Sequence, residues 1–138
     1  MSYNTIGKYI KDLKFNIPNP ETFFSLSKDI SNYKINIDIK SSQVKQNIIE
    51  ILTSINLSQI KDDSDKIEAS VVYATVIELD QKKIKKDEIE KIILIKVPNE
   101  VYPELRSIFI FLFENSGFKD VKIKESVNFE DLYNQKKI

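Results

Sequence analysis

Two long segments in which apolar and polar residues alternate place the tightest constraint on how this chain can fold. Residues 47–59 and 67–79 both repeat with a period of two and are rich in β-branched residues, which is typical of half-buried strands. Their apolar faces comprise Ile49, Ile51, Thr53, Ile55 and Leu57 in the first segment and Ile67, Ala69, Val71, Tyr73, Thr75, Ile77 and Leu79 in the second. Because the short polar stretch 61–66 joins them, the pattern predicts a long antiparallel hairpin.

Two more strands are predicted before this hairpin. Residues 5–16 alternate roughly, as an edge strand would, and residues 32–40 alternate cleanly between isoleucines and polar side chains. Between them, Pro18 and Pro20 argue against a regular helix, because proline lacks an amide hydrogen and clashes with the preceding turn. We therefore expect an extended crossover there, and it carries a pair of phenylalanines.

The helices are predicted in the C-terminal half. Residues 80–91 are highly charged and favour a partly helical segment. Asn99 is a suitable N-cap for a long helix that runs to about Asn115, with Gly117 as the residue that ends it. A short terminal helix is expected to start near Asn128.

These elements predict an α+β fold, with a four-stranded antiparallel sheet and both a long helix and a short C-terminal helix on one face. A chain of 138 residues with 41% hydrophobic residues has enough apolar side chains for one core. We expect residues 1–138 to form a single domain.

A run of six apolar residues lies within the predicted long helix. The run consists of Ile108, Phe109, Ile110, Phe111, Leu112 and Phe113. It is apolar on every side, which is more than one stripe of a surface helix needs. We expect the run to pack against the sheet on one side and against a second subunit on the other. The alternative is a monomer in which this helix is fully buried.

Missing residue types exclude several kinds of chemistry. The chain has no histidine or cysteine, which excludes thiol nucleophiles, histidine-based triads and metal sites built from those ligands. Its two glycines, Gly7 and Gly117, are far apart, so no phosphate-binding loop exists. The acidic clusters 62–65 and 87–90 lie among lysines and are typical of solvated surface. We expect no catalytic residue, no metal and no cofactor, and we predict that the protein is not an enzyme.

Charge and hydropathy bear on partners and location. The 21 basic and 21 acidic residues give zero net charge, which argues against a nucleic-acid partner. No segment reaches the roughly 20 apolar residues that a membrane-spanning helix needs, so no membrane insertion is expected. The first residues lack the long apolar core of a signal peptide, and a chain without cysteine suits the cytoplasm.

Four segments, in order, resemble the bacterial SecB protein-export chaperones. YIKDLKFNIPNPETFF (residues 9–24) resembles the family's first strand and crossover, and INIDIKSSQV (35–44) resembles its second strand. PNEVYPELRSI (98–108) is similar to the opening of its long helix, and SVNFEDLY (126–133) is similar to the start of its final helix. The resemblance therefore spans nearly the whole chain.

This resemblance implies a fold, an assembly and an activity. It implies a four-stranded antiparallel sheet with two helices, assembled as a homotetramer (a dimer of dimers) with the long helices at the subunit interface. It also implies an ATP-independent holdase that binds unfolded precursor proteins and delivers them to the SecA motor of the translocase. Two alternatives stay open: a SecB-like chaperone dedicated to a client outside export, such as an antitoxin, and an oligomeric scaffold without chaperone activity.

A holdase needs exposed apolar surface that accepts many sequences. We expect the walls of a client-binding groove to include Phe23, Phe24, Tyr33, Ile35, Ile37 and Phe129. Leu132 and Tyr133 of the last helix are further candidates. The alternative for each of these side chains is that it is simply part of the core.

The acidic face that the family uses to dock SecA is partly matched. Asp12 falls on one acidic position of the family, whereas two others fall at Asn16 and at about Ser70. Glu68 and Glu78 lie at other points and could compensate for them. We therefore expect a docking face that includes Asp12, Glu68 and Glu78.

Overall fold

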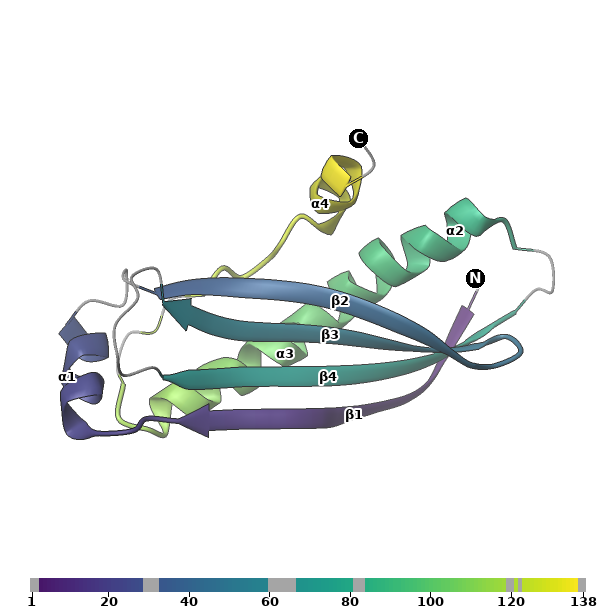
Figure 1. Cartoon of the computed structure of the whole chain (residues 1–138). Helices are drawn as coiled ribbons and strands as arrows, with labels where there is room; N and C mark the ends of the chain where they lie inside the picture. Colours follow the sequence, from purple (N-terminus) through teal and green to yellow (C-terminus); the bar gives the residue numbers. More distant parts are fainter. Residues whose placement is uncertain are drawn as a thin grey trace.

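The computed structural model of the chain contains a four-stranded antiparallel sheet with a long helix across one face (Figure 1). The structure describes residues 3–28, 33–59, 67–80, 84–118, 121 and 123–136. The strands are β1 (Tyr3–Asn16), β2 (Tyr33–Lys45), β3 (Ile48–Gln59) and β4 (Glu68–Leu79). The helices are α1 (Pro20–Lys28), α2 (Lys86–Lys91), the π-helical η2 (Ile92–Lys96), α3 (Val97–Glu114) and α4 (Phe129–Lys136). The predicted fold class is confirmed.

The strand order β1-β4-β3-β2 places β1 and β2 at the two edges of the sheet. All three pairings are antiparallel, so the predicted pairing of β3 with β4 is confirmed, although the turn predicted over 61–66 lies outside the described residues. The face predicted to be apolar is buried beneath the helix, with Ile51, Ile55, Val71 and Ile77 fully inaccessible. Alternation in the sequence therefore gave the correct face because one side of this sheet is covered.

α1 corrects the predicted crossover, which is helical where we expected extended chain. Pro20 is the first residue of α1, a position where the missing amide hydrogen would have no helical partner in any case. The Asn19 side-chain oxygen accepts hydrogen bonds from the Thr22 amide (2.8 Å) and hydroxyl (2.7 Å), as an N-cap does. Leu26 anchors the helix in the core. In chain order α1 thus lies between β1 and β2, and in space it lies at the end of the sheet where β2 begins (Figure 1).

The long helix also starts earlier than predicted. α2, η2 and α3 follow one another without a break, so Asn99 lies inside the helix rather than at its N-cap. The π turn, in which the Val97 amide donates to the Ile92 carbonyl, directly precedes Pro98. Pro103 leaves the carbonyl of Asn99 without a helical donor, and Asn99 is exposed to water. Both prolines are accommodated because their effects fall on a π turn and on a solvated position.

The predicted end of this helix is confirmed. Gly117 has a φ of 97°, the left-handed conformation that glycine adopts readily. The Phe118 amide donates to the Phe113 carbonyl at 3.1 Å, which closes a Schellman motif. The turn brings the Phe118 ring onto those of Phe113 (5.5 Å between centroids) and Phe23 (4.7 Å), so α1 and α3 share one aromatic cluster.

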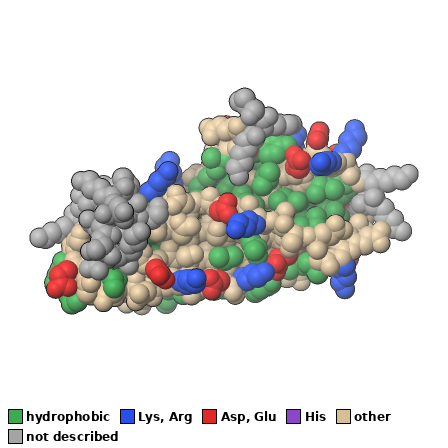
Figure 2. Space-filling view, viewed as in Figure 1, with side chains coloured by type: hydrophobic (Ala, Val, Ile, Leu, Met, Phe, Trp, Pro, Cys, Tyr) green, Lys and Arg blue, Asp and Glu red, His purple; other side chains and the backbone are tan. Residues whose placement is uncertain are grey.

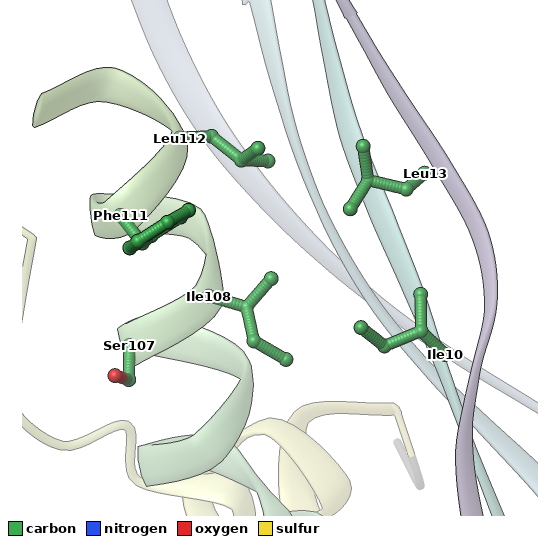
Figure 3. Close-up of a pocket in the computed structure, with 6 residues that line it drawn as sticks. All are labelled: Ile10, Leu13, Ser107, Ile108, Phe111 and Leu112. Carbon is green, nitrogen blue, oxygen red and sulfur yellow. The ribbon is translucent and has the colours of Figure 1, made fainter. Parts of the chain in front are cut away.

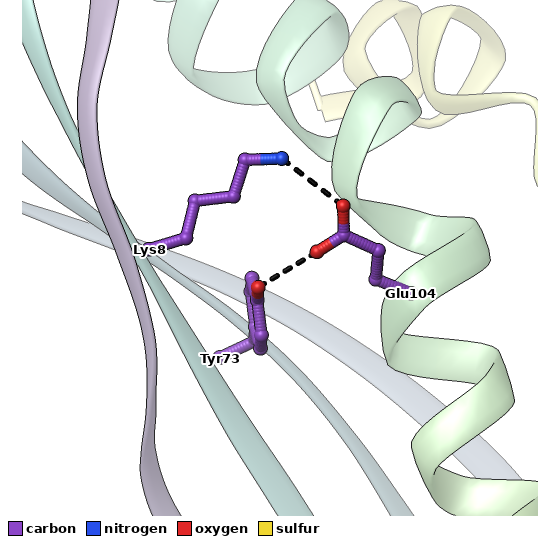
Figure 4. A network of polar contacts seen from close by, with 3 residues as sticks. All are labelled: Lys8, Tyr73 and Glu104. Atoms are coloured by element: carbon purple, nitrogen blue, oxygen red, sulfur yellow. Dashed lines mark hydrogen bonds and ion pairs between the residues drawn. The ribbon is translucent and has the colours of Figure 1, made fainter.

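Polar contacts at Glu104 tie α3 to the sheet (Figure 4). The Tyr73 hydroxyl of β4 donates to Glu104 at 2.7 Å, and Lys8 of β1 pairs with the same carboxylate at 3.0 Å. The hydrogen bonds from Tyr73 and then Lys8 lower the pKa of Glu104, so the carboxylate stays charged. Burial, followed by the Glu104 contact, raises the pKa of Tyr73 to about 12, so its hydroxyl remains a donor. These contacts fix the position of α3 relative to the β1 edge.

Candidate functional site

A groove of about 820 Å³ runs beside the β2 edge of the sheet. Residues 34–37 of β2 form one wall, and Leu57 of β3 and Tyr102 of α3 form the floor. The opposite wall consists of residues from the segment 123–128 together with Asp131 and Leu132 of α4. Leu132 is 43% exposed, so the groove presents apolar surface to solvent.

Two hydrogen bonds hold the wall opposite β2 in place. The Tyr102 hydroxyl donates to the Lys124 carbonyl at 2.7 Å, and the Arg106 Nε donates to the Ile123 carbonyl at 3.1 Å. Burial raises the pKa of Tyr102, so the hydroxyl keeps its proton. Since both donors belong to α3, the long helix sets the distance between this segment and the sheet.

α4 is fixed by its buried side. Phe129 is only 1% exposed and contacts the Tyr102 ring edge to face, with 6.1 Å between the centroids. The Tyr133 hydroxyl donates to Glu90 of α2 at 3.2 Å. With these two residues on the inside of α4, the next apolar residue, Leu132, lies on the groove side.

The structure brings together some of the predicted groove residues. Ile35 and Ile37 lie in the β2 wall and are half-buried. Phe129 supports α4 from beneath and is not among the lining residues. The side chain of Tyr33 lies outside the described residues.

The two predicted crossover phenylalanines lie on α1, away from the groove lining. Phe24 is 60% exposed, and its ring contacts that of Phe23 at 5.8 Å between centroids. Phe23 is half-buried, because it packs on Phe118. Of this pair, Phe24 is therefore the one that offers apolar surface to a partner.

Four apolar lining residues were missed by sequence reasoning: Leu57, Tyr102, Ile123 and Val127. The alternation of β3 correctly assigned Leu57 to the covered face of the sheet, but it did not indicate that the groove reaches this residue. Val127 lies in the segment whose resemblance to the family's final helix was noted. Ile123 alternates with Lys122 and Lys124 in the sequence, but outside a predicted sheet this alternation does not indicate which side is covered.

A second apolar hollow, of about 360 Å³, lies between β1 and α3 (Figure 3). Ile10 and Leu13 point from β1 toward Ile108 and Leu112 of α3, and Phe111 stands at the rim. Ile10 and Leu13 are both exposed by more than two fifths. This surface joins an open sheet edge to an apolar helix flank.

The six apolar residues of the predicted interface divide into two groups. Phe109 and Phe113 are fully buried against the sheet and have no surface left for a partner. Phe111 is 60% exposed, whereas Ile108, Ile110 and Leu112 are partly buried. The alternative in which a single chain buries this helix completely is therefore wrong, since Phe111 is exposed to water in one chain.

The predicted acidic residues share the sheet face opposite α3, and all three are exposed. Asp12 lies opposite Val72, and Glu68 and Glu78 lie near the two ends of β4. On the same face, Glu50 accepts hydrogen bonds from Lys11 (2.8 Å) and Tyr9. The Lys11 contact, followed by that from Tyr9, lowers the pKa of Glu50. Figure 2 shows side chains of both charges interspersed along the β1 edge, so this face is mixed rather than uniformly acidic.

Two kinds of feature are absent from the described residues. Among these residues no group of three or more acidic side chains could hold a metal ion. No helix there is both long enough and apolar enough to cross a membrane.

Comparison with known proteins identifies relatives over nearly the full length. Residues 2–138 match the family model for the preprotein translocase subunit SecB. A protein assigned as protein-export protein SecB in Pelagibacter ubique is 38% identical, with 98% of this chain and 96% of that protein covered. The protein-export protein SecB of Anaplasma phagocytophilum is 22% identical, over 92% of this chain and 87% of that protein.

A solved structure shares the fold. A SecB-like chaperone of Mycobacterium tuberculosis, in complex with a peptide from the HigA1 antitoxin, aligns with a TM-score of 0.63. The alignment covers 89% of this chain and 90% of that chain at 10% identity. The family model and the 38% identical relative show that the chain belongs to the SecB family of protein-export chaperones, and that it is a chaperone rather than an enzyme.

Proposed function

We propose that the groove beside β2 is where this chaperone holds unfolded precursor proteins before export. The observation that carries the proposal is apolar surface, on Ile35, Ile37 and Leu132, that lines an open groove instead of the closed core. Such surface holds extended chains by side-chain contacts that depend little on sequence. Because the hydrophobic effect supplies the binding energy, holding a client requires no nucleotide.

A role in protein export is favoured over a role with one dedicated client, such as an antitoxin. The relatives similar in sequence are export proteins, and one of them is 38% identical to this chain. The structure bound to an antitoxin peptide shares only 10% identity and supports the fold alone.

Leu132→Ser is expected to weaken client holding with little effect on folding, since Leu132 is partly exposed yet lines the groove. Loss of one apolar side chain contact should lower client affinity by roughly tenfold. The assay is suppression of aggregation of an unfolded precursor protein by increasing amounts of chaperone. Val44→Ser is the matched control, because Val44 is an apolar residue of β2, 57% exposed and outside the groove. Equal activity of both variants would contradict the proposed site.

We further propose that the chain assembles as a homotetramer, a dimer of dimers, with the hollow between β1 and α3 as one of its two kinds of subunit contact. Support comes from the exposed aromatic ring of Phe111 next to Ile10 and Leu13. Exposed apolar patches of this kind are typical of contacts between protein subunits. Several grooves on one assembly would bind a long client with avidity.

SecA is proposed as the partner that docks on the sheet face opposite α3. Asp12, Glu68 and Glu78 support this proposal because all three are exposed there. Their spread is wide, since Glu68 and Glu78 lie roughly 33 Å apart along β4 at about 3.3 Å per residue. Docking should therefore depend on several separate charges instead of one cluster.

Changing Asp12→Asn, Glu68→Gln and Glu78→Gln together is expected to weaken SecA binding, most clearly at low salt, where surface charges are least screened. The measurement is a titration of SecA with the chaperone at two salt concentrations. Asp87→Asn, Glu88→Gln and Glu130→Gln make the same change in charge on α2 and α4, away from this face. If the two triple variants bind SecA equally well, the acidic residues of the sheet do not dock it.

We also propose a cytoplasmic location. A chaperone that receives precursor proteins before their export must act in the compartment where they are synthesised.

A further inference from the structure

Glu50 is a charged residue on the open face of the sheet, yet little of its side chain reaches water. It lies on β3 opposite Val76 of β4, on the face that α3 does not cover (Figure 1). Its side chain is only 13% exposed, whereas the three acidic residues proposed to dock SecA are all exposed. Glu50 is therefore covered at the surface by neighbouring side chains, and it is not part of the core.

Both carboxylate oxygens of Glu50 bind side chains of β1, which lies on the far side of β4. The Lys11 Nζ pairs with Oε1 at 2.8 Å, and the Tyr9 hydroxyl donates to Oε2. Between the two strands, the small and fully buried Ala74 of β4 pairs with Tyr9 on one side and with Leu52 on the other. The contact with Lys11, followed by that with Tyr9, lowers the pKa of Glu50, so the carboxylate stays charged. An anion on this face is thus neutralised by the chain itself.

A bulge in β1 brings Lys11 to the open face. Ile10 and Asp12 pair with consecutive residues of β4, so Lys11 is an extra residue between them. Ile10 points toward α3, whereas Asp12 lies on the open face. In a regular strand Lys11 and Asp12 would point to opposite faces, but the contact with Glu50 places Lys11 on the open face as well. The bulge therefore holds an ammonium group among the acidic residues of this face.

Glu50 also lies within the wide spacing of the acidic residues proposed to dock SecA. In the register of β4, Asp12 is level with Val72 and Glu50 is level with Val76. Glu78 follows two residues after Val76 on the same face. Glu50 would therefore shorten the longest gap that a basic partner has to cross between Asp12 and Glu78.

We infer that Glu50 is a fourth docking position for a basic segment of SecA, and that Lys11 competes with this segment for it. This inference rests on the proposed docking of SecA and adds an autoinhibitory contact to that surface. Lys11 is 44% exposed, and an ion pair so open to water contributes little to stability, so a basic side chain of the partner can displace its ammonium group. Because the internal contact is lost whenever SecA occupies Glu50, Lys11 lowers the affinity. Removing its charge should strengthen docking.

The test is a titration of SecA with variants of the full chain at physiological ionic strength, where the Debye length of about 8 Å screens distant charges. Lys11→Met removes the ammonium group and keeps a long, unbranched side chain, whereas Lys11→Arg keeps the charge. Lys14→Met is the matched control, because Lys14 is also exposed on the open face of β1, opposite Ser70. None of the ion pairs among the described residues involves Lys14. Glu50→Gln, alone and together with Lys11→Met, removes the position that Lys11 covers. Circular dichroism checks that each variant is folded.

Lys11→Met is expected to raise the affinity for SecA by roughly three- to fivefold, whereas Lys14→Met and Lys11→Arg should change it by less than about twofold. Combined with Glu50→Gln, Lys11→Met should bring no gain, because the position that it uncovers is no longer charged. Equal gains from Lys11→Met and Lys14→Met would overturn the inference, since the effect would then be one of net charge. So would a gain that persists with Glu50→Gln, or unchanged or weaker binding of Lys11→Met. Failure of the proposed docking itself is distinct, because neither the unchanged protein nor any variant would then bind SecA.

Discussion

Phe111→Asp is expected to break the assembly into smaller species. Phe111 is 60% exposed in one chain and borders the hollow formed with Ile10 and Leu13 of β1. If a second subunit covers this surface, the substitution removes a large aromatic contact and buries a carboxylate among apolar groups. The dissociation constant should rise by roughly a hundredfold or more. Light scattering at micromolar concentration would show a lower mass than that of the unchanged protein.

Phe24→Asp is the matched control for this experiment. Phe24 has the same exposed fraction, but it lies on α1, away from the hollow. We expect it to leave the assembly mass unchanged. An equal mass for the unchanged protein and Phe111→Asp would show that this hollow is not the subunit contact.

Phe109→Ala is expected to have the largest effect on stability. Phe109 is fully buried and contacts the Phe113 ring at 5.1 Å between centroids, where α3 meets the sheet. Removing its ring should lower the free energy of unfolding by about 3–5 kcal/mol, since the transfer energy is lost and a cavity remains. Chemical denaturation, with circular dichroism of the helices as readout, measures this change.

The same substitution at an exposed ring provides the comparison. Phe24→Ala should cost less than about 1 kcal/mol, because surface substitutions rarely cost more. Similar losses at Phe109 and Phe24 would contradict the burial of α3 against the sheet. The protein concentration must be equal in both experiments, since assembly adds stability by mass action.

Part of the site could be predicted from the sequence. The alternation of residues 32–40 placed Ile35 and Ile37 together on one strand face, and both line the groove. Phe23 and Phe24 were predicted to line the same groove, but both lie on α1 and are not among its lining residues. Here Asn19 and Thr22 form a cap that the two nearby prolines led us to discount. Local capping outweighed the helix-breaking tendency of proline, because Pro20 occupies the first position of the helix.

The sequence by itself determined the strands, the covered face of the sheet and the end of the long helix at Gly117. These features depend on interactions between neighbours along the chain, or on a periodicity of two that a buried face imposes. Only the tertiary structure decided which apolar residues remain accessible. Phe109 and Phe111 are two positions apart in one run, yet the first is fully buried and the second is exposed. In an α-helix two such residues point about 200° apart, so exposure is set by the side on which the sheet lies.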